Sequence, residues 1–442
     1  MPYRAFPVLD PLLRAGYEVT LIVEPPQGLA TDALAVASAR ADVVVCWCAE
    51  LHPGLQVPGI LSFLAQTDGH SNRILGGGFL TFDAARELEV PSDLVLVHGS
   101  ENGCLAVAVA EACDHPEVAS RQAMGIEAVL GVDLTEFTRS EEHLLGNTNA
   151  ALQLPTGLGC GRRCPFCFYE QAPWRAVGAA DVVRMVVYAR RRFGIEQFLM
   201  GELDFFASQR RALQIADGLI DDAPGVRWFA LGSVQDIAAL DDSMIARLAR
   251  SGLHCLEMGT EVGDDVARRR LGKQFTAEEA RATNRRLHRA GIVPLHNILL
   301  GCPGETAAER RTTLALVDAL HAETAGAARF NFRRYQPIPG TTMGDAALRG
   351  APPLPTGLTA VQDLRLGEHD RVMPWLDAAS EREVLHLTDH LLPVGYDPGP
   401  HASPKPNVRQ AARAQCRALP SDQLLAATDC NDAMTLPQTY QP

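Results

Sequence analysis

The chain has 442 residues, a length that suits two or three domains. Hydrophobic residues make up 47% and charged residues 21%, which is an ordinary composition for a folded globular protein. The formal net charge is −13, from 40 basic and 53 acidic residues, so the overall charge does not favour binding to nucleic acid.

No apolar run is long enough to span a bilayer, and the amino terminus lacks the charged-then-apolar pattern of a signal peptide. The 11 cysteines, an odd number without such a signal, indicate a reducing compartment. We therefore expect a cytoplasmic protein with no membrane span and no nucleic-acid partner. Two short basic runs, Arg190–Arg192 and Arg268–Arg270, each end a predicted helix and are expected to be solvated.

Residues 1–112 alternate short apolar runs with helical patterns, and Phe6–Ala15 and Ser100–Ala112 are the clearest helices. The apolar runs are continuous rather than alternating, as in a parallel sheet that is covered on both faces. This rhythm predicts an α/β domain of the doubly wound, Rossmann-like type. The predicted strands are Glu18–Val23, Asp42–Cys48, Arg73–Leu75 and Leu94–Val97.

Two segments that could contact a ligand follow strands of this first domain. Gly76, Gly77 and Gly78 come directly after the third predicted strand, and Gly99 and Ser100 open the helix after the fourth. Ligands bind doubly wound sheets at the carboxyl ends of the strands, where glycine permits a close approach of the backbone. A triple glycine taken alone is more often a plain turn.

Residues 113–150 are predicted to be a connector that ends at the breaker Gly146–Asn149, and residues 346–442 a loop-rich carboxy-terminal extension with a helix at Ser380–Leu392. Between them, residues 151–345 contain six strand-then-helix units, which predict a partial (β/α)6 TIM-like barrel. Thr276 and Thr306 open capping boxes. The six predicted strands are Ala151–Leu158, Gln197–Met200, Arg227–Leu231, Leu253–Met258, Ile292–Leu300 and Ala328–Tyr335.

Three cysteines, Cys160, Cys164 and Cys167, follow the first of these strands within one short loop. Thiolates at this spacing can converge on one face of an iron–sulfur cluster, and soft sulfur selects such clusters or zinc. A structural zinc site normally closes with four protein ligands, and no fourth cysteine or histidine lies close by in the sequence. The alternatives are a zinc site completed from a distant segment and three unrelated core thiols.

This loop, with Phe166 just before the third cysteine, resembles the signature of the radical S-adenosylmethionine (SAM) superfamily. The resemblance implies a [4Fe-4S] cluster held by the three cysteines, with SAM bound at the fourth iron. It implies that one electron from the cluster cleaves SAM to methionine and a 5′-deoxyadenosyl radical, which abstracts hydrogen from the substrate. It also implies an external electron donor such as flavodoxin or ferredoxin.

The same resemblance assigns SAM contacts to residues at other strand ends. Glu202, with Asp204 as a competing candidate, would hold the amino group of SAM, and Glu261 would accept hydrogen bonds from the ribose hydroxyls. Gly301 lies in a Gly-x-Pro-Gly-Glu-Thr turn whose strand would pack against adenine. Glu305 in that turn is expected to support the helix start. Phe166 and Ser233 complete the expected SAM contacts, and no catalytic residue is identified.

The glycine loop, the next strand and the Gly-Ser-Glu helix start together resemble the cobalamin-binding domain that precedes many radical SAM cores. The resemblance implies that Gly76, Gly77, Gly78, Gly99 and Ser100 surround the nucleotide tail of cobalamin. Asp-x-His-x-x-Gly, the motif that supplies a histidine to cobalt in other corrinoid proteins, does not occur. The usual first strand is also missing from the pattern. A misassigned start codon, a truncated domain or a degenerate one would each explain this.

The resemblance implies a cobalamin-dependent methyltransferase that moves a methyl group from methylcobalamin to an unactivated carbon of a small-molecule or natural-product substrate. The alternatives are a non-methylating radical reaction, such as cyclisation, ring rearrangement or oxidation, and a non-catalytic iron–sulfur or corrinoid sensor. His254 and His296 are expected to be core or channel histidines rather than metal ligands, and Cys255 and Cys302 small apolar fillers.

Overall fold

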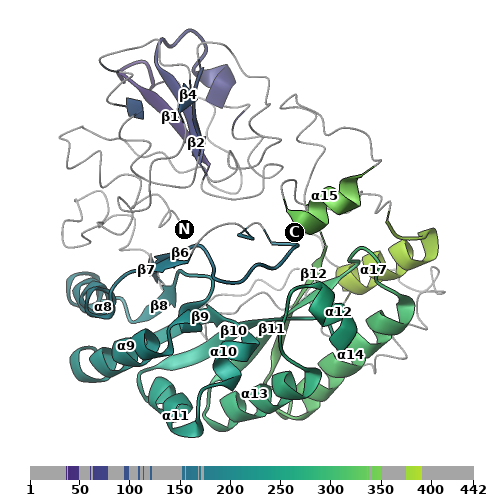
Figure 1. Ribbon diagram of the computed structural model, residues 1–442. Coiled ribbons are helices and arrows are strands. Elements are labelled where there is room, and N and C mark those ends of the chain that lie inside the picture. The colour runs from purple at the N-terminus through teal and green to yellow at the C-terminus, as the bar shows by residue number, and fades with distance from the viewer. Residues whose placement is uncertain are drawn as a thin grey trace, which may run out of the picture.

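The computed structural model shows an α/β protein with two parallel sheets, the larger of which is lined by helices (Figure 1). The structure describes residues 36, 38–48, 60, 63–77, 94–98, 108–109, 113, 120–121, 152–154, 156–167, 169–170, 174–335, 337, 341–349 and 375–390.

The smaller sheet has four described strands that pair in parallel, in the order of the sequence. Its buried side chains include Ile74, Leu75, Leu94 and Val95, which confirms that these apolar runs are core strands. The reversal of strand order that defines a doubly wound sheet is not found among the described strands. The strands are β1 (Val44–Cys48), β2 (Arg73–Gly77), β3 (Leu94–His98) and β4 (Ser120–Arg121), and the predicted Glu18–Val23 and Phe6–Ala15 lie outside the described residues.

The larger sheet has six described strands, all parallel, in the order β12-β11-β10-β9-β8-β5. Each strand is added beside the one that precedes it in the chain, so every crossover carries its helix to the same face of the sheet. The five strands after the first lie within three residues of their predicted bounds. They are β8 (Gln197–Met200), β9 (Arg227–Gly232), β10 (Leu253–Glu261), β11 (Val293–Leu300) and β12 (Arg329–Arg334), and β5 is Leu152–Leu154.

The predicted first strand, Ala151–Leu158, is not one strand. After β5, the chain forms β6 (Gly157–Leu158), which pairs antiparallel with β7 (Arg175–Ala176) in a separate small sheet. Pro155 stands between the two pieces and has no N–H with which to continue a ladder. The cysteine loop therefore leaves from a hairpin that sits at the carboxyl end of β5.

The helices alternate with these strands and cover the outer face of the sheet (Figure 1). Both predicted capping boxes are present, at Thr276 with Glu279 and at Thr306 with Glu309. Gly252, just before β10, has φ 96, and a Cβ there would collide with the carbonyl oxygen of Val226. The helices are α8 (Ala179–Phe193), η3 (Phe205–Ala207), α9 (Gln209–Asp222), α10 (Val234–Ala238), α11 (Asp242–Arg250), α12 (Asp265–Arg270), α13 (Ala277–Arg289), α14 (Ala307–Ala322), α15 (Thr342–Leu348) and α17 (Ala378–His390).

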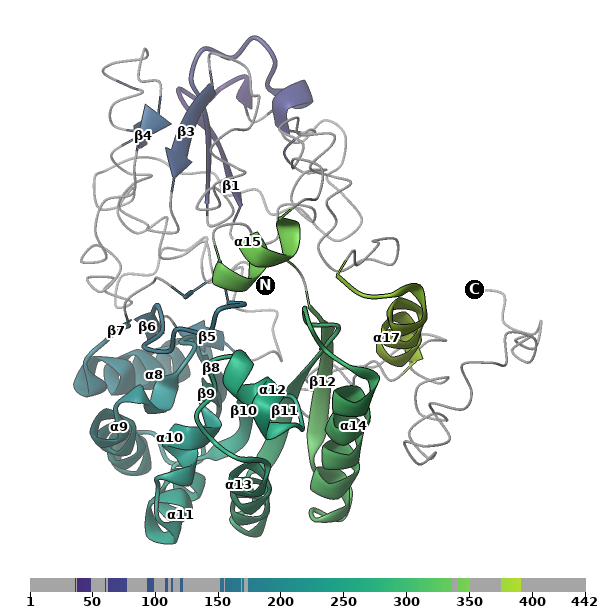
Figure 2. The same cartoon turned by 45° about the vertical axis from the view of Figure 1, so that its right-hand side comes forward.

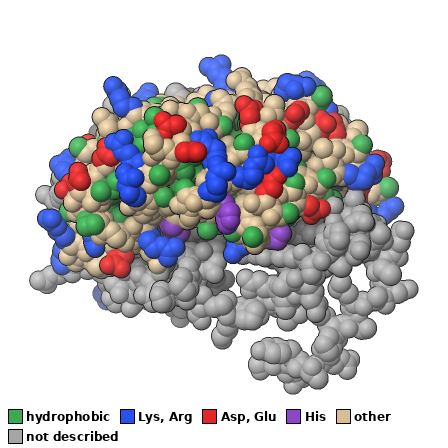
Figure 3. Space-filling model, turned by 90° about the horizontal axis from the view of Figure 1, so that it is seen from below, with side chains coloured by type: hydrophobic (Ala, Val, Ile, Leu, Met, Phe, Trp, Pro, Cys, Tyr) green, Lys and Arg blue, Asp and Glu red, His purple; other side chains and the backbone are tan. Residues whose placement is uncertain are grey.

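The surface seen from below in Figure 3 carries basic and acidic side chains side by side. Arg285 pairs with Glu278 at 2.7 Å and Arg286 with Asp242 at 2.6 Å. The expectation for the run Arg268–Arg270 was wrong in part, because Arg268 is fully buried and donates to the Val262 carbonyl. In the part of the chain that the structure describes, no helix is long and apolar enough to cross a membrane.

The predicted carboxy-terminal helix exists as α17 and packs beside β12 (Figure 2). Its buried Val384 and Leu387 contact a cluster that contains Ile298, Leu300 and Phe332 of the last two strands. Helix α15 lies between the two sheets in the same view. Two elements from the carboxy-terminal part of the chain, α15 and α17, therefore lie beside the larger sheet.

Candidate active site

The cysteine loop lies at the carboxyl edge of the six-stranded sheet. Cys164 is buried, and Cys160 and Cys167 are partly buried. The backbone N–H of Arg162 donates to Cys160 Sγ at 3.4 Å, and that of Tyr169 donates to Cys167 Sγ at 3.5 Å. Such donors favour the thiolate form, and hydrogen bonds to sulfur are one means by which proteins tune iron–sulfur clusters.

Burial raises the pKa of all three thiols, that of Cys167 to about 11. The ammonium group of Lys273 acts against this rise at each of the three cysteines. Three soft sulfur donors near one cation fit a [4Fe-4S] cluster, whose own positive charge would stabilise thiolates in this half-buried position.

In the described residues, no three His, Cys, Asp or Glu side chains converge on the point that one metal ion would occupy. Cysteine ligands of a cubane cluster bind different irons, so they need not converge in this way.

Lys273 connects the cysteine loop to the end of β10. Its Nζ lies 3.0 Å from Glu261 Oε1 and 5.6 Å from the centre of the Phe166 ring. Glu261 has φ 63, which is uncommon for a residue other than glycine, and the register with β11 shifts between Gly259 and Glu261. A Cβ at Gly259 would lie 2.6 Å from Glu261 Oε1 and 2.7 Å from Lys273 Nζ. Glycine at this position therefore leaves the space that the ion pair fills.

Gly272, the residue before Lys273, packs closely against the cysteine loop. Gly272 has φ 73, and a Cβ there would lie 3.1 Å from Pro165 Cδ and 3.3 Å from the carbonyl oxygen of Arg163. The sequence analysis predicted Glu261 and Phe166 as SAM contacts, but it did not identify Gly272 or Lys273 as residues of the site. A Gly-Lys pair after a helix is a common helix end, so its pattern alone does not distinguish a functional lysine.

Glu202 is buried at the end of β8 and already has a cationic partner. Arg211 Nη2 lies 3.0 Å from Glu202 Oε2, close enough for an ion pair although without hydrogen-bond geometry, while Nη1 donates to Oε1 at 3.3 Å. Trp174 Nε1 also donates to Oε1 at 3.3 Å. Arg211 further donates to the carbonyl oxygens of Val177 and Thr156. Arg211 thus joins the hairpin beneath the cysteine loop to Glu202.

Asp204 makes a second carboxylate group at the same edge. Arg162 Nε donates to Asp204 Oδ2 at 3.3 Å and also pairs with Asp236. The backbone N–H of Ser233 donates to Asp204 Oδ1 at 3.3 Å. Burial, followed by the charge of Asp236, raises the pKa of Asp204 to about 6. The structure thus brings Ser233 and Asp204 together and links both to the cysteine loop through Arg162.

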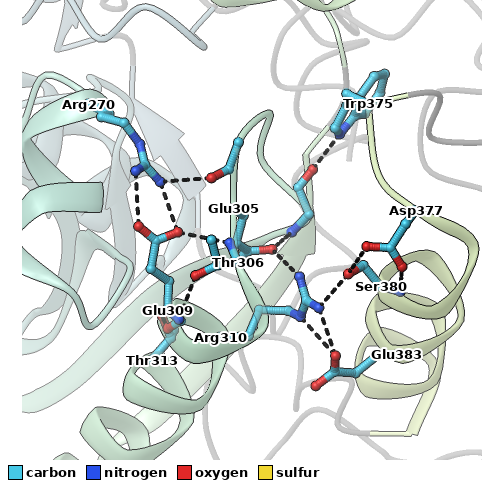
Figure 4. A network of polar contacts seen from close by, with 12 residues as sticks. Arg270, Glu305, Thr306, Glu309, Arg310, Thr313, Trp375, Asp377, Ser380 and Glu383 are labelled. Carbon is cyan, nitrogen blue, oxygen red and sulfur yellow. Dashed lines mark hydrogen bonds and ion pairs between the residues drawn. The ribbon is translucent and has the colours of Figure 1, made fainter.

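The turn after β11 is held by a polar network that reaches α17 (Figure 4). Gly301 N–H donates to Glu305 Oε2 at 2.7 Å, and Trp375 Nε1 donates to the Gly301 carbonyl at 2.8 Å. Arg310 lies 3.4 Å from Glu305 Oε2 and 2.7 Å from Glu383 Oε2. Burial raises the pKa of Glu305 to about 7. Glu305 thus holds Gly301 at the strand end and Arg310 of α14, and the expected contact with the start of the helix is not among these contacts.

Helix α15 binds the cysteine loop directly. Its Met343 N–H donates to the Pro165 carbonyl at 2.8 Å. Thr342 donates from its N–H to Glu170 Oε2 at 2.8 Å and from its hydroxyl to Glu170 Oε1 at 2.6 Å. Met343 and Phe166 both pack against one buried apolar cluster, which includes Tyr335. A segment about 170 residues downstream therefore holds the loop in place, which no local pattern indicates.

The other predicted residues fall at several places. Gly76 and Gly77 end β2, while Gly78, Gly99 and Ser100 lie outside the described residues.

His296 is a core histidine as expected, because it bonds Thr260 Oγ1 at 2.8 Å and Asn284 Oδ1 at 3.0 Å. Burial lowers the pKa of His254 to about 4. Cys255 and Cys302 are buried.

Comparisons with known proteins add to this geometry. Residues 154–317 match the family model described as the Radical SAM superfamily. An uncharacterized methyltransferase of Pyrococcus horikoshii is 21% identical over 196 residues, 44% of this chain and 41% of its own length. An uncharacterized protein of Methanopyrus kandleri is 33% identical over 90 residues, 20% of this chain and 17% of its own length. The chain thus spans less than half the length of both curated relatives.

Two solved structures share the fold. TsrM from Kitasatospora setae, a radical S-adenosylmethionine methyltransferase with cobalamin and a [4Fe-4S] cluster bound, aligns with a TM-score of 0.63 at 15% identity and covers 98% of this chain and 97% of its own. OxsB, a cobalamin-dependent S-adenosylmethionine radical enzyme, aligns with a TM-score of 0.56 at 15% identity, over 72% of this chain and 49% of its own. Residues 154–317, which include the three loop cysteines, are therefore a radical SAM domain.

Proposed function

We propose that this protein is a cobalamin-dependent radical SAM methyltransferase, with residues 1–112 as the cobalamin domain, 113–150 as the connector, 151–345 as the radical SAM core and 346–442 as the extension. The observation that carries the proposal is the set of three cysteine thiols, each within the electrostatic influence of Lys273, at the carboxyl edge of the parallel sheet. In this proposal the six strands form a partial barrel whose open end receives the cofactors.

In the proposed active site, Cys160, Cys164 and Cys167 hold the cluster. When bound, the cluster supplies the electron that cleaves SAM, and cobalamin supplies the methyl group. The side chains of this chain bind and orient SAM. Phe166 and Ser233 border the SAM site, Glu261 accepts from the ribose hydroxyls, and the backbone at Gly301 packs against adenine.

Glu202 has a different place in this proposal. Arg211 neutralises its carboxylate, so we assign Glu202 a supporting position under the amino group of SAM, with Asp204 beside it. Lys273 keeps the Glu261 carboxylate over Gly259 and keeps positive charge next to the cluster. The ion pairs Glu202–Arg211 and Glu261–Lys273 each hold a carboxylate in place before SAM binds. This lowers the entropic cost of ordering the site on binding.

The proposed cobalamin site lies at the carboxyl ends of β2 and β3. In Figure 2 the arrow of β3 points from the smaller sheet towards the larger one. TsrM, which aligns with nearly the whole of this chain, has cobalamin bound, and this supports a corrinoid site in the protein. Gly76, Gly77, Gly78, Gly99 and Ser100 are the proposed contacts. The substrate would be a small molecule or natural product, and a flavodoxin or ferredoxin would be the electron donor.

Anaerobic reconstitution with iron, sulfide and hydroxocobalamin tests the proposal. The visible spectrum reports retained cluster and corrinoid, and product analysis after addition of SAM and reductant reports its fate. Retained corrinoid with both S-adenosylhomocysteine and 5′-deoxyadenosine is the expected result. Replacement of any one loop cysteine by Ser should remove the deoxyadenosine, and its persistence in Cys164→Ser would refute the assigned cluster.

A different product pattern would select the alternative. Deoxyadenosine without S-adenosylhomocysteine, and without retained corrinoid, would favour a non-methylating radical reaction. A protein that binds cluster and corrinoid but never cleaves SAM would be a sensor.

A further inference from the structure

A ladder of polar side chains crosses the inner face of the six-stranded sheet, the face away from the helices. Asn297 Nδ2 of β11 donates to Glu257 Oε1 of β10 at 2.8 Å. Asn331 Nδ2 of β12 donates to Asn297 Oδ1 at 2.9 Å. The three residues come from three adjacent strands, and none of them belongs to the contacts proposed above for SAM or the cluster.

The alternation of side chains along β10 shows which face of the sheet carries the ladder. Leu256 and Met258 pack into the large core with the helices, and Thr260 bonds His296, which in turn bonds Asn284 of α13. Side chains alternate along a strand, so Glu257 points to the opposite face.

Glu257 stands among apolar neighbours on this inner face. Its register partners are Leu231 on β9 and Leu295 on β11. The row nearer the amino ends of the strands is also apolar, because Cys255 pairs with Phe229 and Val293. Burial raises the pKa of Glu257, because a carboxylate loses solvation among these apolar side chains. Since one hydrogen bond from Asn297 uses only part of its acceptor capacity, the carboxylate has room for a further donor.

The ladder is close to the proposed reaction centre. The Glu261 carboxylate and the Lys273 ammonium lie against the position of Gly259, which is the next inner-face position after Glu257. Two residues of a strand span roughly 7 Å, so Glu257 lies one level below that ion pair. A ligand anchored at Glu257 would have its other end directed towards the cysteine loop.

The charges around Glu257 indicate which ligand it would take. Arg333 attracts the Glu257 carboxylate through space, and the Glu261 carboxylate, which is paired with Lys273, repels it less strongly. Asn331 donates to Asn297, and Asn297 donates to Glu257. This series of hydrogen bonds therefore ends at the Glu257 carboxylate, which can accept hydrogen bonds. An amine is a strong donor to such a group, and the apolar row suits a hydrocarbon or aromatic body.

We propose that Glu257, positioned by Asn297 and Asn331, is a substrate-binding residue that selects an apolar molecule with a protonated amine. The inference rests on the proposed function, and it deepens that function by naming the chemical class of its substrate. Glu257 binds the amine, the partly exposed Leu231 and Val293 contact the apolar body, and the asparagines hold the carboxylate in place.

Binding calorimetry with a matched pair of probes tests this inference. Reconstituted holoenzyme is titrated with phenethylamine and with 3-phenylpropionate, which share the aromatic body and differ in the sign of their charge. Phenethylamine should bind at least tenfold more tightly than the acid. Glu257→Gln, which is nearly isosteric, should weaken the amine at least tenfold and leave the acid unchanged or improved. Asn297→Ala should weaken the amine to a smaller extent.

Glu278→Gln on α13 is the matched control, since it removes a carboxylate from the outer surface, and it should leave amine binding unchanged. Failure of the amine to bind the native holoenzyme, equal binding of the two probes, or equal affinity in Glu257→Gln would each overturn the inference. The same preparations are assayed for SAM cleavage. Cleavage without amine selectivity removes only this inference, whereas amine selectivity without any cleavage removes only the proposed function. Equal thermal midpoints of the native and Glu257→Gln proteins establish that the variant is folded.

Discussion

The buried carboxyl of Glu305 should make the stability of this protein depend on pH, and Glu305→Gln should remove that dependence. The residue is 9% exposed, its Oε1 has no hydrogen-bond partner among the described residues, and burial raises its pKa to about 7. The Gly301 N–H and Arg310 act against this rise but do not offset it. The folded protein therefore holds the proton of Glu305 more tightly than the unfolded chain does.

The magnitude follows from the two pKa values. With about 7 in the folded state and the ordinary value of 4.5 in the unfolded state, the stabilising contribution of the carboxyl is fully present below pH 4.5 and is lost as the pH rises through 7. Between pH 5 and pH 8 the loss is about 2.5 kcal/mol, at 1.36 kcal/mol per pKa unit. Gln cannot titrate but can still accept from the Gly301 N–H. The free energy of unfolding of the variant, relative to that of the native protein, should therefore rise by about 2.5 kcal/mol between pH 5 and pH 8.

Guanidinium unfolding of the metal-free protein at pH 5, 6, 7 and 8 measures this difference. The quantity to compare is the free energy of unfolding of Glu305→Gln minus that of the native protein, because other titrating groups cancel in it. Glu278→Gln, whose carboxyl is on the surface, serves as the control. A difference that stays constant within about 0.5 kcal/mol across the four pH values would show that the Glu305 carboxyl is already ionised in the fold, and the reasoning from burial would be wrong.

Three further substitutions test other contacts of the site. Lys273→Met removes the cation that faces all three thiols and should lower iron incorporation, measured as iron per protein, and weaken SAM binding about tenfold; unchanged iron content would contradict its electrostatic role. Arg211→Met leaves the Glu202 carboxylate buried without its partner and should cost about 3 kcal/mol in denaturant unfolding, whereas Arg211→Met with Glu202→Gln should recover part of it. Gly272→Ala, with φ 73 and a crowded Cβ, should cost about 1–2 kcal/mol and slow cluster loading, and a native loading rate would show that the loop does not rest on this turn.

Local patterns were sufficient for most of the larger sheet. β8 has the bounds that its apolar run predicts, and the capping boxes at Thr276 and Thr306 form because their partners lie three residues away. The cysteine loop was found for the same reason, since its three thiols are adjacent in the sequence. The first core strand was predicted to be longer than it is, because its apolar pattern continues past Pro155 while the hydrogen-bond ladder does not.

The remaining parts of the site depend on contacts between distant segments. Arg211 contacts Glu202, Val177 and Thr156 because the fold brings together positions as far as 55 residues apart in the sequence. Lys273 meets the cysteines only because the loop after α12 returns under them. The clamp of Thr342 on Glu170 joins positions 172 residues apart. Helical or strand periodicity carries no information on such pairs, so a single sequence cannot predict them.

The linear order of strands in the larger sheet has a consequence for synthesis. As the chain leaves the ribosome, each new strand can dock on the one before it, so the growing sheet exposes one fresh edge at a time. That edge is β12 once the last described strand is made, and the later segment α17 then packs beside it. A nascent or clipped chain that stops before residue 375 would retain apolar side chains at an uncovered edge, where chaperones or aggregation would act on it.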